Sequence, residues 1–257
     1  MSLRGRCALV TGAARGIGFA IAQALCEQGM SVALNDVDAD AGQLAASRLT
    51  SAGHNALALP GDVTDAAQVA AFTDRAESEL GSLWLLVNNA GIFRSGPAEI
   101  LSEQDWDKAF AVDAKAVFLC SQAAIRRMAP RRAGRIVVVS SIAGTIVRVG
   151  QIAYCSAKAA AIHFARCLAV EMAPRGITVN CICPGMTDSE MLRQTAQGRG
   201  VSIEDYLEMI PAARLASPVD HARAIAWLAS EEAQHITGQV ISIDGGQSLY
   251  HPVTKNP

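Results

Sequence analysis

A tyrosine and a lysine four positions apart, Tyr154 and Lys158, are the side chains of this sequence best suited to proton chemistry. In a helix, residues at this spacing project from one face, one turn apart. Because a nearby ammonium favours the phenolate, we expect Lys158 to lower the pKa of the Tyr154 phenol from its usual value of about 10. Ser141 follows the apolar run 136–139, and a strand leading into a helix would bring its hydroxyl beside the phenol. These residues predict a proton donor, and an exposed tyrosine and lysine on a helix surface are the alternative.

A glycine-rich loop near the start of the chain is the first element that could hold a ligand beside them. Residues 7–10 predict a buried strand, residues 19–28 predict a helix, and a loop with the spacing G-x-x-x-G-x-G lies between them. Strand, loop and helix in this order predict a phosphate cradle, because glycine permits close backbone approach and a helix amino terminus favours an anion. The spacing differs from the common G-x-G-x-x-G dinucleotide fingerprint. The expected ligand contacts are Gly12, Arg15, Gly16, Ile17 and Gly18.

Asp36 ends the second predicted strand, residues 31–35, eighteen positions after Gly18. An acidic residue near this position meets the adenosine ribose hydroxyls in dinucleotide-binding folds. A carboxylate accepts hydrogen bonds from a diol and repels a 2′-phosphate, so Asp36 favours NAD over NADP. Arg15 is the opposing feature, because a guanidinium could bind that phosphate.

Predicted strands alternate with predicted helices along the whole chain, which indicates one doubly wound α/β domain over residues 1–257, with a seven-stranded parallel sheet and helices on both faces. A long helix is expected from Ser102 to about Met128, a substrate loop at about 186–216 and a C-terminal tail at 247–257. Open parallel sheets bind ligands at the carboxyl ends of their strands. The residues expected there to contact the dinucleotide are Asp62, Val63, Asn89, Ala90, Gly91, Pro184 and Gly185.

The composition excludes several classes of function. The 257 residues are 51% hydrophobic and carry a formal net charge of −2, which argues against nucleic acid as the main partner. The start of the chain has no secretory apolar region, and no apolar run is long enough to span a membrane. The seven cysteines and five histidines form no ligand-spaced pairs. We therefore expect reduced thiols, a cytoplasmic location and no metal site.

Taken together, these motifs resemble the short-chain dehydrogenase/reductase family from Arg6 to Gly246. The resemblance rests on Thr11-Gly12-x-x-x-Gly16-x-Gly18, Asp62, Asn88-Asn89-Ala90-Gly91, Ser141, Tyr154-x-x-x-Lys158 and Pro184-Gly185. It implies a Rossmann fold, a nicotinamide cofactor, a homotetramer, and hydride transfer between a secondary alcohol and a ketone.

The resemblance also implies a role for each site residue. Tyr154 would be the general acid/base, Ser141 would orient the substrate oxygen, and Lys158 would hold the nicotinamide ribose and lower the phenol's pKa. Thr187 and Ser189 fall where the family contacts the nicotinamide carboxamide.

Asp113 departs from the family, which usually has asparagine at this position as the fourth member of a catalytic tetrad. An asparagine donates and accepts hydrogen bonds, whereas an ionised aspartate only accepts. Two readings follow: an ionised Asp113 that weakens the effect of Lys158 on the phenol, or a protonated Asp113 that acts as a donor.

Several local stretches are similar to 2,3-dihydro-2,3-dihydroxybenzoate dehydrogenases, among them 93–96, 148–161 and 184–188. Arg94 and Arg148 fall where the family lines its pocket, and a guanidinium suits a carboxylate; two surface arginines without a ligand are the alternative. The other expected substrate contacts are Ile142, Gln151, Met186 and Met191. The sequence thus predicts an NAD(H)-dependent oxidoreductase for a small, cyclic or anionic substrate. An NADPH-dependent 3-oxoacyl-thioester reductase and an inactive nucleotide-binding scaffold are the alternatives.

Overall fold

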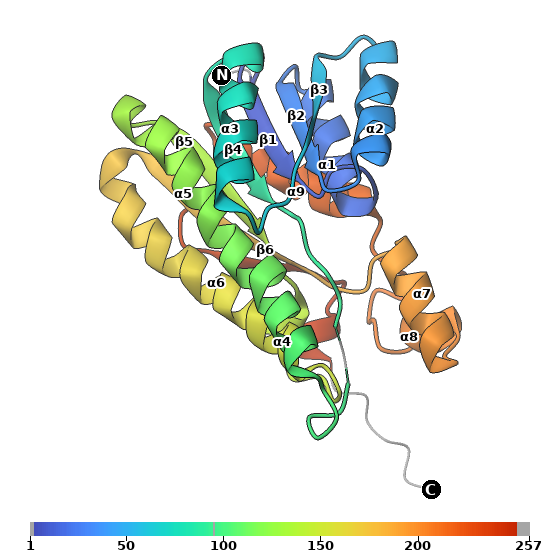
Figure 1. The fold of residues 1–257 in the computed structure, drawn as a ribbon. Coiled ribbons are helices and arrows are strands. Elements are labelled where there is room, and N and C mark those ends of the chain that lie inside the picture. The colour runs from blue at the N-terminus through green and yellow to red at the C-terminus, as the bar shows by residue number, and fades with distance from the viewer. Residues whose placement is uncertain (1–2, 95, 251–257) are drawn as a thin grey trace, which may run out of the picture.

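The computed structural model describes residues 3–94 and 96–250, and the core of this part of the chain is a seven-stranded sheet (Figure 1). Neighbouring strands are all parallel, in the order β3-β2-β1-β4-β5-β6-β7. The strands are β1 (Cys7–Thr11), β2 (Ser31–Asp36), β3 (Ala56–Pro60), β4 (Leu83–Asn88), β5 (Gly134–Val139), β6 (Ile177–Pro184) and β7 (Val240–Ile243). The predicted α/β fold is confirmed, and the strand order reverses between β1 and β4, where such sheets bind ligands.

Helices cover both faces of the sheet because each strand is apolar on both sides. Cys7 and Leu9 of β1 pack with α3, α5 and α6, whereas Ala8 and Val10 pack with α1, α2 and α9. This alternation follows the two-residue period of a strand buried on both faces. The helices named are α1 (Gly16–Glu27), α2 (Ala39–Ser51), α3 (Ala66–Leu80), α5 (Ala116–Met128), α6 (Ile152–Met172) and α9 (Pro218–Ala229).

The long helix predicted from Ser102 to Met128 is present, but its middle is not α-helical. Ser102 accepts the N–H of Asp105 and caps α4 (Glu103–Phe110), as predicted. A π-helical turn, Ala111–Lys115, then joins α4 to α5. Such turns widen a helix locally and occur often at functional sites. Here the turn contains Asp113, whose side chain is buried.

The region after β6 contains the predicted substrate loop. Two helices, α7 (Glu190–Arg199) and α8 (Ile203–Leu207), lie apart from the sheet beyond its strand ends (Figure 1). Ser217 caps α9 and Pro218 begins it, as predicted. Of the predicted tail, Gln247–Leu249 form a 3₁₀ turn, while residues 251–257 lie outside the described residues, as does Ser95. None of the helices in the described ranges is long and apolar enough to cross a bilayer.

Candidate active site

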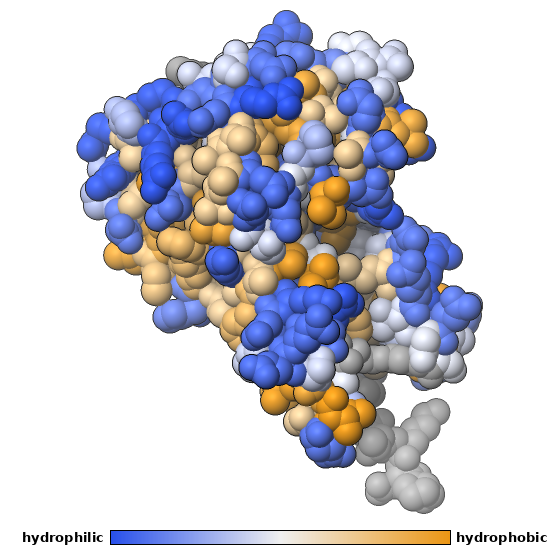
Figure 2. Space-filling model, viewed as in Figure 1, coloured by the Kyte–Doolittle hydropathy of each residue, from blue (hydrophilic) through white to orange (hydrophobic). Residues whose placement is uncertain are grey.

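A cleft of about 1460 Å³ lies at the carboxyl ends of the strands and extends to α7 and α8. Figure 2 shows this side of the molecule hollowed between the main body and the α7–α8 segment, with apolar side chains in the hollow. Every residue predicted to bind a cofactor or substrate lines the cleft, as do Ser141, Tyr154 and Lys158. Asp113, the remaining predicted residue, lies behind Lys158 and does not line the cleft.

The glycine loop after β1 lines one end of this cleft. A β carbon at Gly18 would lie 2.1 Å from the Gly12 carbonyl oxygen, so a larger residue does not fit there. The first turn of α1 follows at Gly16, and the Arg15 side chain makes no capping hydrogen bond to it. The first N–H groups of α1 can therefore donate to an anion, which a helix amino terminus favours. This loop fits a dinucleotide pyrophosphate.

Asp36 lies at the end of β2, and both of its carboxylate oxygens accept backbone hydrogen bonds. Oδ2 accepts the Ala14 N–H at 3.0 Å, and Oδ1 accepts the Asp38 N–H at 3.1 Å. The Asp38 carboxylate pairs with the Arg15 guanidinium, with 2.7 Å between Oδ2 and Nη2. The arginine expected to attract a 2′-phosphate is thus partly neutralised, whereas Asp36 keeps lone pairs for a ribose diol.

Asn89, predicted as a ligand contact, uses both protons of its amide to join β4 to β1. Its Nδ2 donates to the carbonyl oxygens of Thr11 and Gly12, both at 2.9 Å. The Thr11 hydroxyl accepts the N–H groups of Asn89 at 3.0 Å and Ala90 at 3.1 Å. This clamp holds the glycine loop at the point where the strand order reverses.

Asp62 follows β3 and turns the chain along the cleft wall. Its Oδ1 accepts both the N–H and the hydroxyl of Thr64, each at 2.8 Å. The turn leaves the buried Val63 side chain in the cleft lining. Val63, which also belongs to the core, is thus an apolar contact in this part of the wall.

Tyr154 lies in the first turn of α6, near enough to Ser141 for the serine side chain to lower the pKa of the phenol. Ser141 follows β5, and its Oγ accepts the Ala143 N–H at 3.1 Å. The Phe93 ring packs edge-on against the Tyr154 ring, with centroids 5.1 Å apart. The Lys158 Nζ lies 5.6 Å from the Tyr154 ring centroid. The fold thus brings together the three residues expected to carry proton chemistry.

Lys158 and Asp113 form a buried ion pair, with 3.0 Å between Nζ and Oδ1. Oδ1 also accepts the Ile92 N–H at 3.2 Å, and Nζ donates to the Val139 carbonyl at 3.5 Å. Oδ2 has no hydrogen-bond partner within the described part of the chain. A β carbon at Gly91 would lie 2.8 Å from Oδ1 and 3.1 Å from Nζ, so only glycine fits against the pair.

The groups of this cluster shift one another's pKa values. Burial raises the pKa of the Tyr154 phenol, and with the Asp113 charge it outweighs the lowering by Lys158 and by the Ser141 hydrogen bond. The predicted lowering by Lys158 is therefore present, but burial and Asp113 outweigh it and the net pKa of the phenol is raised. Burial also raises the pKa of the Asp113 carboxyl, against the effect of Lys158. Burial alone would lower the pKa of the Lys158 ammonium, but Asp113 and Tyr154 raise it above its ordinary value.

Thr187 and Ser189, expected near a nicotinamide carboxamide, both line the cleft after β6. The Thr187 Oγ1 lies 3.0 Å from the Gly185 carbonyl oxygen and 2.8 Å from Nε2 of His221, a buried residue of α9. Ser189 caps α7 and accepts the Leu192 N–H at 3.3 Å. The Ser189 hydroxyl therefore positions the start of α7 against the cleft.

The two predicted pocket arginines differ in their surroundings. The Arg94 Nε lies 3.3 Å from Oδ1 of Asp105, which neutralises much of its charge. Arg148 is half-buried in the cleft lining and has no ion-pair partner among the described residues. Ile142, Gln151, Met186 and Met191 line the same cleft. Arg148 is therefore the better placed of the two for an anionic ligand.

Among the residues that shape the cleft without a predicted site role are Thr11, Asp38, His221 and Gln247. Thr11 directly precedes the glycine loop and Asp38 caps α2, so their neighbours in the sequence signal them. His221 lies in an ordinary helix, and Gln247, whose Oε1 accepts the Met186 N–H at 3.1 Å, lies after the last strand. No local pattern indicates either of these two residues.

Comparison with known proteins agrees with this geometry. A family model described as enoyl-(acyl carrier protein) reductase matches residues 12–248. The chain is 37% identical over 257 residues to the 2,3-dihydro-2,3-dihydroxybenzoate dehydrogenase of Bacillus subtilis (strain 168), covering 96% of this chain and 97% of that protein. It is 38% identical over 249 residues to the 3-oxoacyl-(acyl-carrier-protein) reductase FabG of Escherichia coli (strain K12), covering 97% and 100%. The crystal structure of a variant actinorhodin polyketide ketoreductase with NADPH superposes with a TM-score of 0.93 at 28% identity, covering 95% and 98%.

Proposed function

The chain belongs to the short-chain dehydrogenase/reductase family, and on this premise we propose that it interconverts a secondary alcohol and a ketone on a small, cyclic, anionic substrate with NAD(H). Membership makes it an oxidoreductase that uses a nicotinamide cofactor. The observation that carries the proposal is the cluster of Tyr154, Ser141 and Lys158, which shares one cleft with a glycine loop suited to pyrophosphate.

In this proposal the cofactor lies along the carboxyl edge of the sheet. The glycine loop would hold the pyrophosphate, Asp36 the adenosine ribose, Val63 the adenine, and Lys158 the nicotinamide ribose. When bound, NAD(H) supplies or accepts the hydride. Each of these residues lines the cleft, and Gly18 lets the start of α1 pack directly against the Gly12 carbonyl of the glycine loop.

The proton is handled by the chain's own residues. In ketone reduction the Tyr154 phenol donates its proton to the substrate oxygen, and in alcohol oxidation the phenolate accepts it. The Ser141 hydroxyl, which lies beside the phenol, orients that oxygen. Lys158 stays an ammonium because its pKa is raised, and it stabilises the phenolate that forms.

The preference for NAD over NADP rests on two carboxylates. Asp36 lies where the ribose hydroxyls would bind, and Asp38 neutralises the Arg15 guanidinium. A 2′-phosphate would therefore meet a carboxylate, and the nearby cation is already paired. We expect the unmodified protein to turn over NADH faster than NADPH at equal concentration and Asp36→Ala to relax this preference. Faster turnover of NADPH by the unmodified protein would reverse the assignment.

The proposal of an anionic substrate rests on Arg148, which lines the cleft without an ion-pair partner in the described ranges. One relative at 37% identity is named for a dihydroxylated benzoate, a cyclic diol with a carboxylate. Oxidation of a panel of cyclic alcohols should favour members that carry a carboxylate over their neutral amides. Arg148→Met should raise KM for the acids about tenfold or more and leave KM for neutral alcohols unchanged. Equal use of acids and amides would remove this assignment.

A second candidate is reduction of a 3-oxoacyl thioester with NADPH, which the 38% identity to FabG favours. The same assays separate the two, since this candidate requires NADPH and a 3-oxoacyl thioester in place of NAD and a cyclic alcohol. A chain that binds nucleotide but turns over neither class would be a scaffold that has lost its chemistry.

We also propose a homotetramer in the cytoplasm. Phe118 of α5 and Val170 of α6 are exposed apolar side chains on adjacent helices, and the Phe118 ring contacts Phe164 edge-on. Exposed apolar surface of this kind is typical of subunit interfaces. Light scattering should give four times the mass of one chain at micromolar concentration, and a monomer would contradict the proposal.

A further inference from the structure

His221 is a buried histidine, and only one of its two ring nitrogens has a hydrogen-bond partner among the described residues. Its Nε2 lies 2.8 Å from the Thr187 Oγ1, and its side chain is fully buried in α9. Nδ1 has no hydrogen-bond partner among the residues that the structure describes. Burial lowers the pKa of the His221 imidazole to about 4, against the opposing effect of the Asp220 carboxylate. The ring is therefore neutral at ordinary pH, and one of its nitrogens carries the single proton.

The contacts of Thr187 decide which nitrogen that is. The hydroxyl has one proton, and the Gly185 carbonyl at 3.0 Å can only accept it. With its proton directed there, the Thr187 oxygen can meet Nε2 only as an acceptor, so Nε2 carries the proton. Nδ1 is then a bare lone pair, and a buried acceptor without a partner is more readily tolerated than a buried N–H without one.

We propose that His221 is a positioning residue that holds Thr187 as a hydrogen-bond acceptor toward the nicotinamide carboxamide. Donation from Nε2 and the bond to Gly185 fix the hydroxyl rotor and leave an oxygen lone pair on the cleft side. That lone pair accepts the carboxamide N–H and offers nothing to a carbonyl. The inference rests on the proposed function, because it requires a nicotinamide in the cleft.

Two nicotinamide analogues make the proposal measurable. The acetylpyridine analogue of NAD keeps the carbonyl but has a methyl group in place of the amide nitrogen, so it cannot donate to Thr187. The unmodified protein should bind NAD more tightly than this analogue by about three- to tenfold, the effect of one neutral hydrogen bond. In His221→Leu the hydroxyl is free to rotate, and the ratio of the two dissociation constants should fall toward one.

Matched variants separate positioning from packing. His221→Gln keeps an N–H donor near the place of Nε2 and should restore the ratio, which a purely structural role would not require. In a Thr187→Val background, His221→Leu should leave the ratio unchanged. A ratio in His221→Leu equal to that of the unmodified protein, with folding intact by circular dichroism, would overturn the proposal.

Nitrogen-15 NMR of the histidines in the unmodified, cofactor-free protein tests the inference without any variant. The expected spectrum assigns a protonated Nε2 and an unprotonated Nδ1 to His221 at neutral pH. A protonated Nδ1 would overturn the inference, even if NAD binds. Failure of NAD to bind, with the expected tautomer present, would instead count against the proposed function.

Discussion

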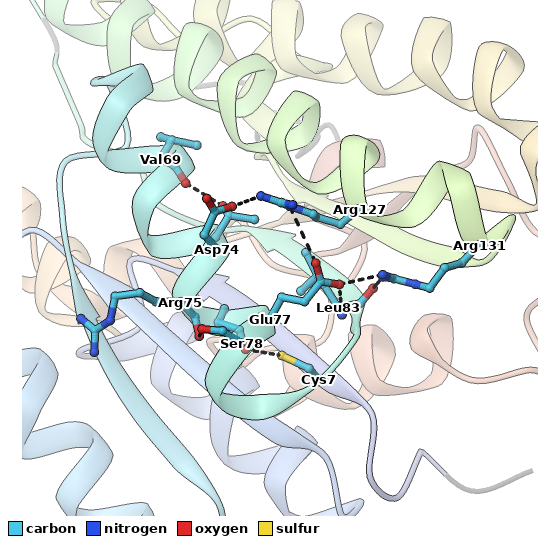
Figure 3. A network of polar contacts seen from close by, with 11 residues as sticks. Cys7, Val69, Asp74, Arg75, Glu77, Ser78, Leu83, Arg127 and Arg131 are labelled. Carbon is cyan, nitrogen blue, oxygen red and sulfur yellow. Dashed lines mark hydrogen bonds and ion pairs between the residues drawn. The ribbon is translucent and has the colours of Figure 1, made fainter.

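Ion pairs between a basic and an acidic side chain occur in two different surroundings in this molecule, at the surface and in the interior. On the surface, Arg127 of α5 and Arg131 just beyond it reach toward α3 and pair with Asp74 and Glu77 (Figure 3). Arg131 bonds Glu77 at 2.7 Å and also donates to the Leu83 carbonyl at 2.8 Å. The Arg127 and Asp74 side chains are 39% and 57% exposed. This network joins two helices, and none of its residues lines the cleft.

The buried group is the pair of Lys158 and Asp113, whose side chains are 6% and 0% exposed. Exposed pairs contribute about 0–1 kcal/mol each, since water screens them and long side chains lose freedom. A buried pair loses the hydration of both charges, and this loss can exceed the attraction between them. The buried pair is thus a poor source of stability, and its strong field acts on whatever titrates beside it, here the Tyr154 phenol.

We expect the largest loss of activity from removing the Tyr154 hydroxyl, the titrating group beside the buried ion pair. Tyr154→Phe keeps the ring and its edge-on contact with Phe93 but removes the hydroxyl. We expect turnover to fall by at least about a hundredfold, since positioned proton transfer contributes about 10²–10⁴-fold, while NAD binding persists. Steady-state rates and equilibrium binding measure the two effects. Tyr250→Phe, at an exposed tyrosine outside the cleft, is the matched control.

Activity of Tyr154→Phe above about a hundredth of the parent rate would remove the phenol as acid/base. Loss of NAD binding together with turnover would point instead to a structural role for the hydroxyl in the buried cluster.

The next effect concerns the carboxylate of the buried pair. Asp113 raises the pKa of the Tyr154 phenol, so its replacement by asparagine should lower that pKa. The phenolate needed for alcohol oxidation would then form at lower pH, and the rising limb of kcat against pH should move toward lower pH. Asp113→Asn should keep or improve activity at neutral pH. Measuring kcat against pH for both proteins tests the shift.

A profile that barely moves would indicate a protonated Asp113 that already acts as a donor, the other reading of this departure from the family. The raised pKa of the Asp113 carboxyl makes that reading physically reasonable. Abolished activity in Asp113→Asn would contradict both readings and assign the carboxylate a direct catalytic role.

Sequence patterns predict the fold and the residues of the buried cluster better than they predict the local geometry and the pKa shifts around that cluster. The apolar runs predict the parallel sheet, and the spacing of Tyr154 and Lys158 places both on one face of α6. The π turn around Asp113 is not predictable in this way, because residues 103–128 have a continuous helical pattern and the turn depends on packing against α6. The net direction of the phenol's pKa also escapes prediction, since it depends on burial and on a carboxylate 41 positions earlier in the chain.

Contacts between distant segments are the other part that sequence alone does not indicate. Asn89 is predicted as a ligand contact from its place after β4, yet its amide protons are used to hold β1. His221 has no motif, and only the folded chain brings its ring to Thr187. Sequence patterns report local periodicity and known motifs, whereas these side chains gain their roles from partners far away in the chain.

The smallest effect should come from the surface network. Arg127→Gln removes the contacts with Asp74 and Glu77, while Arg131 continues to pair with Glu77. We expect a loss of unfolding free energy of about 1 kcal/mol or less, because both partners remain hydrated, and no change in turnover. The loss should shrink further at high salt, which screens exposed charges. Denaturant unfolding at low and high salt measures it, with Arg75→Gln, which breaks a single exposed pair with Glu79, as the control. A loss of several kcal/mol, or one that salt does not reduce, would mean that the surface network resembles the buried pair and that exposure is not what separates them.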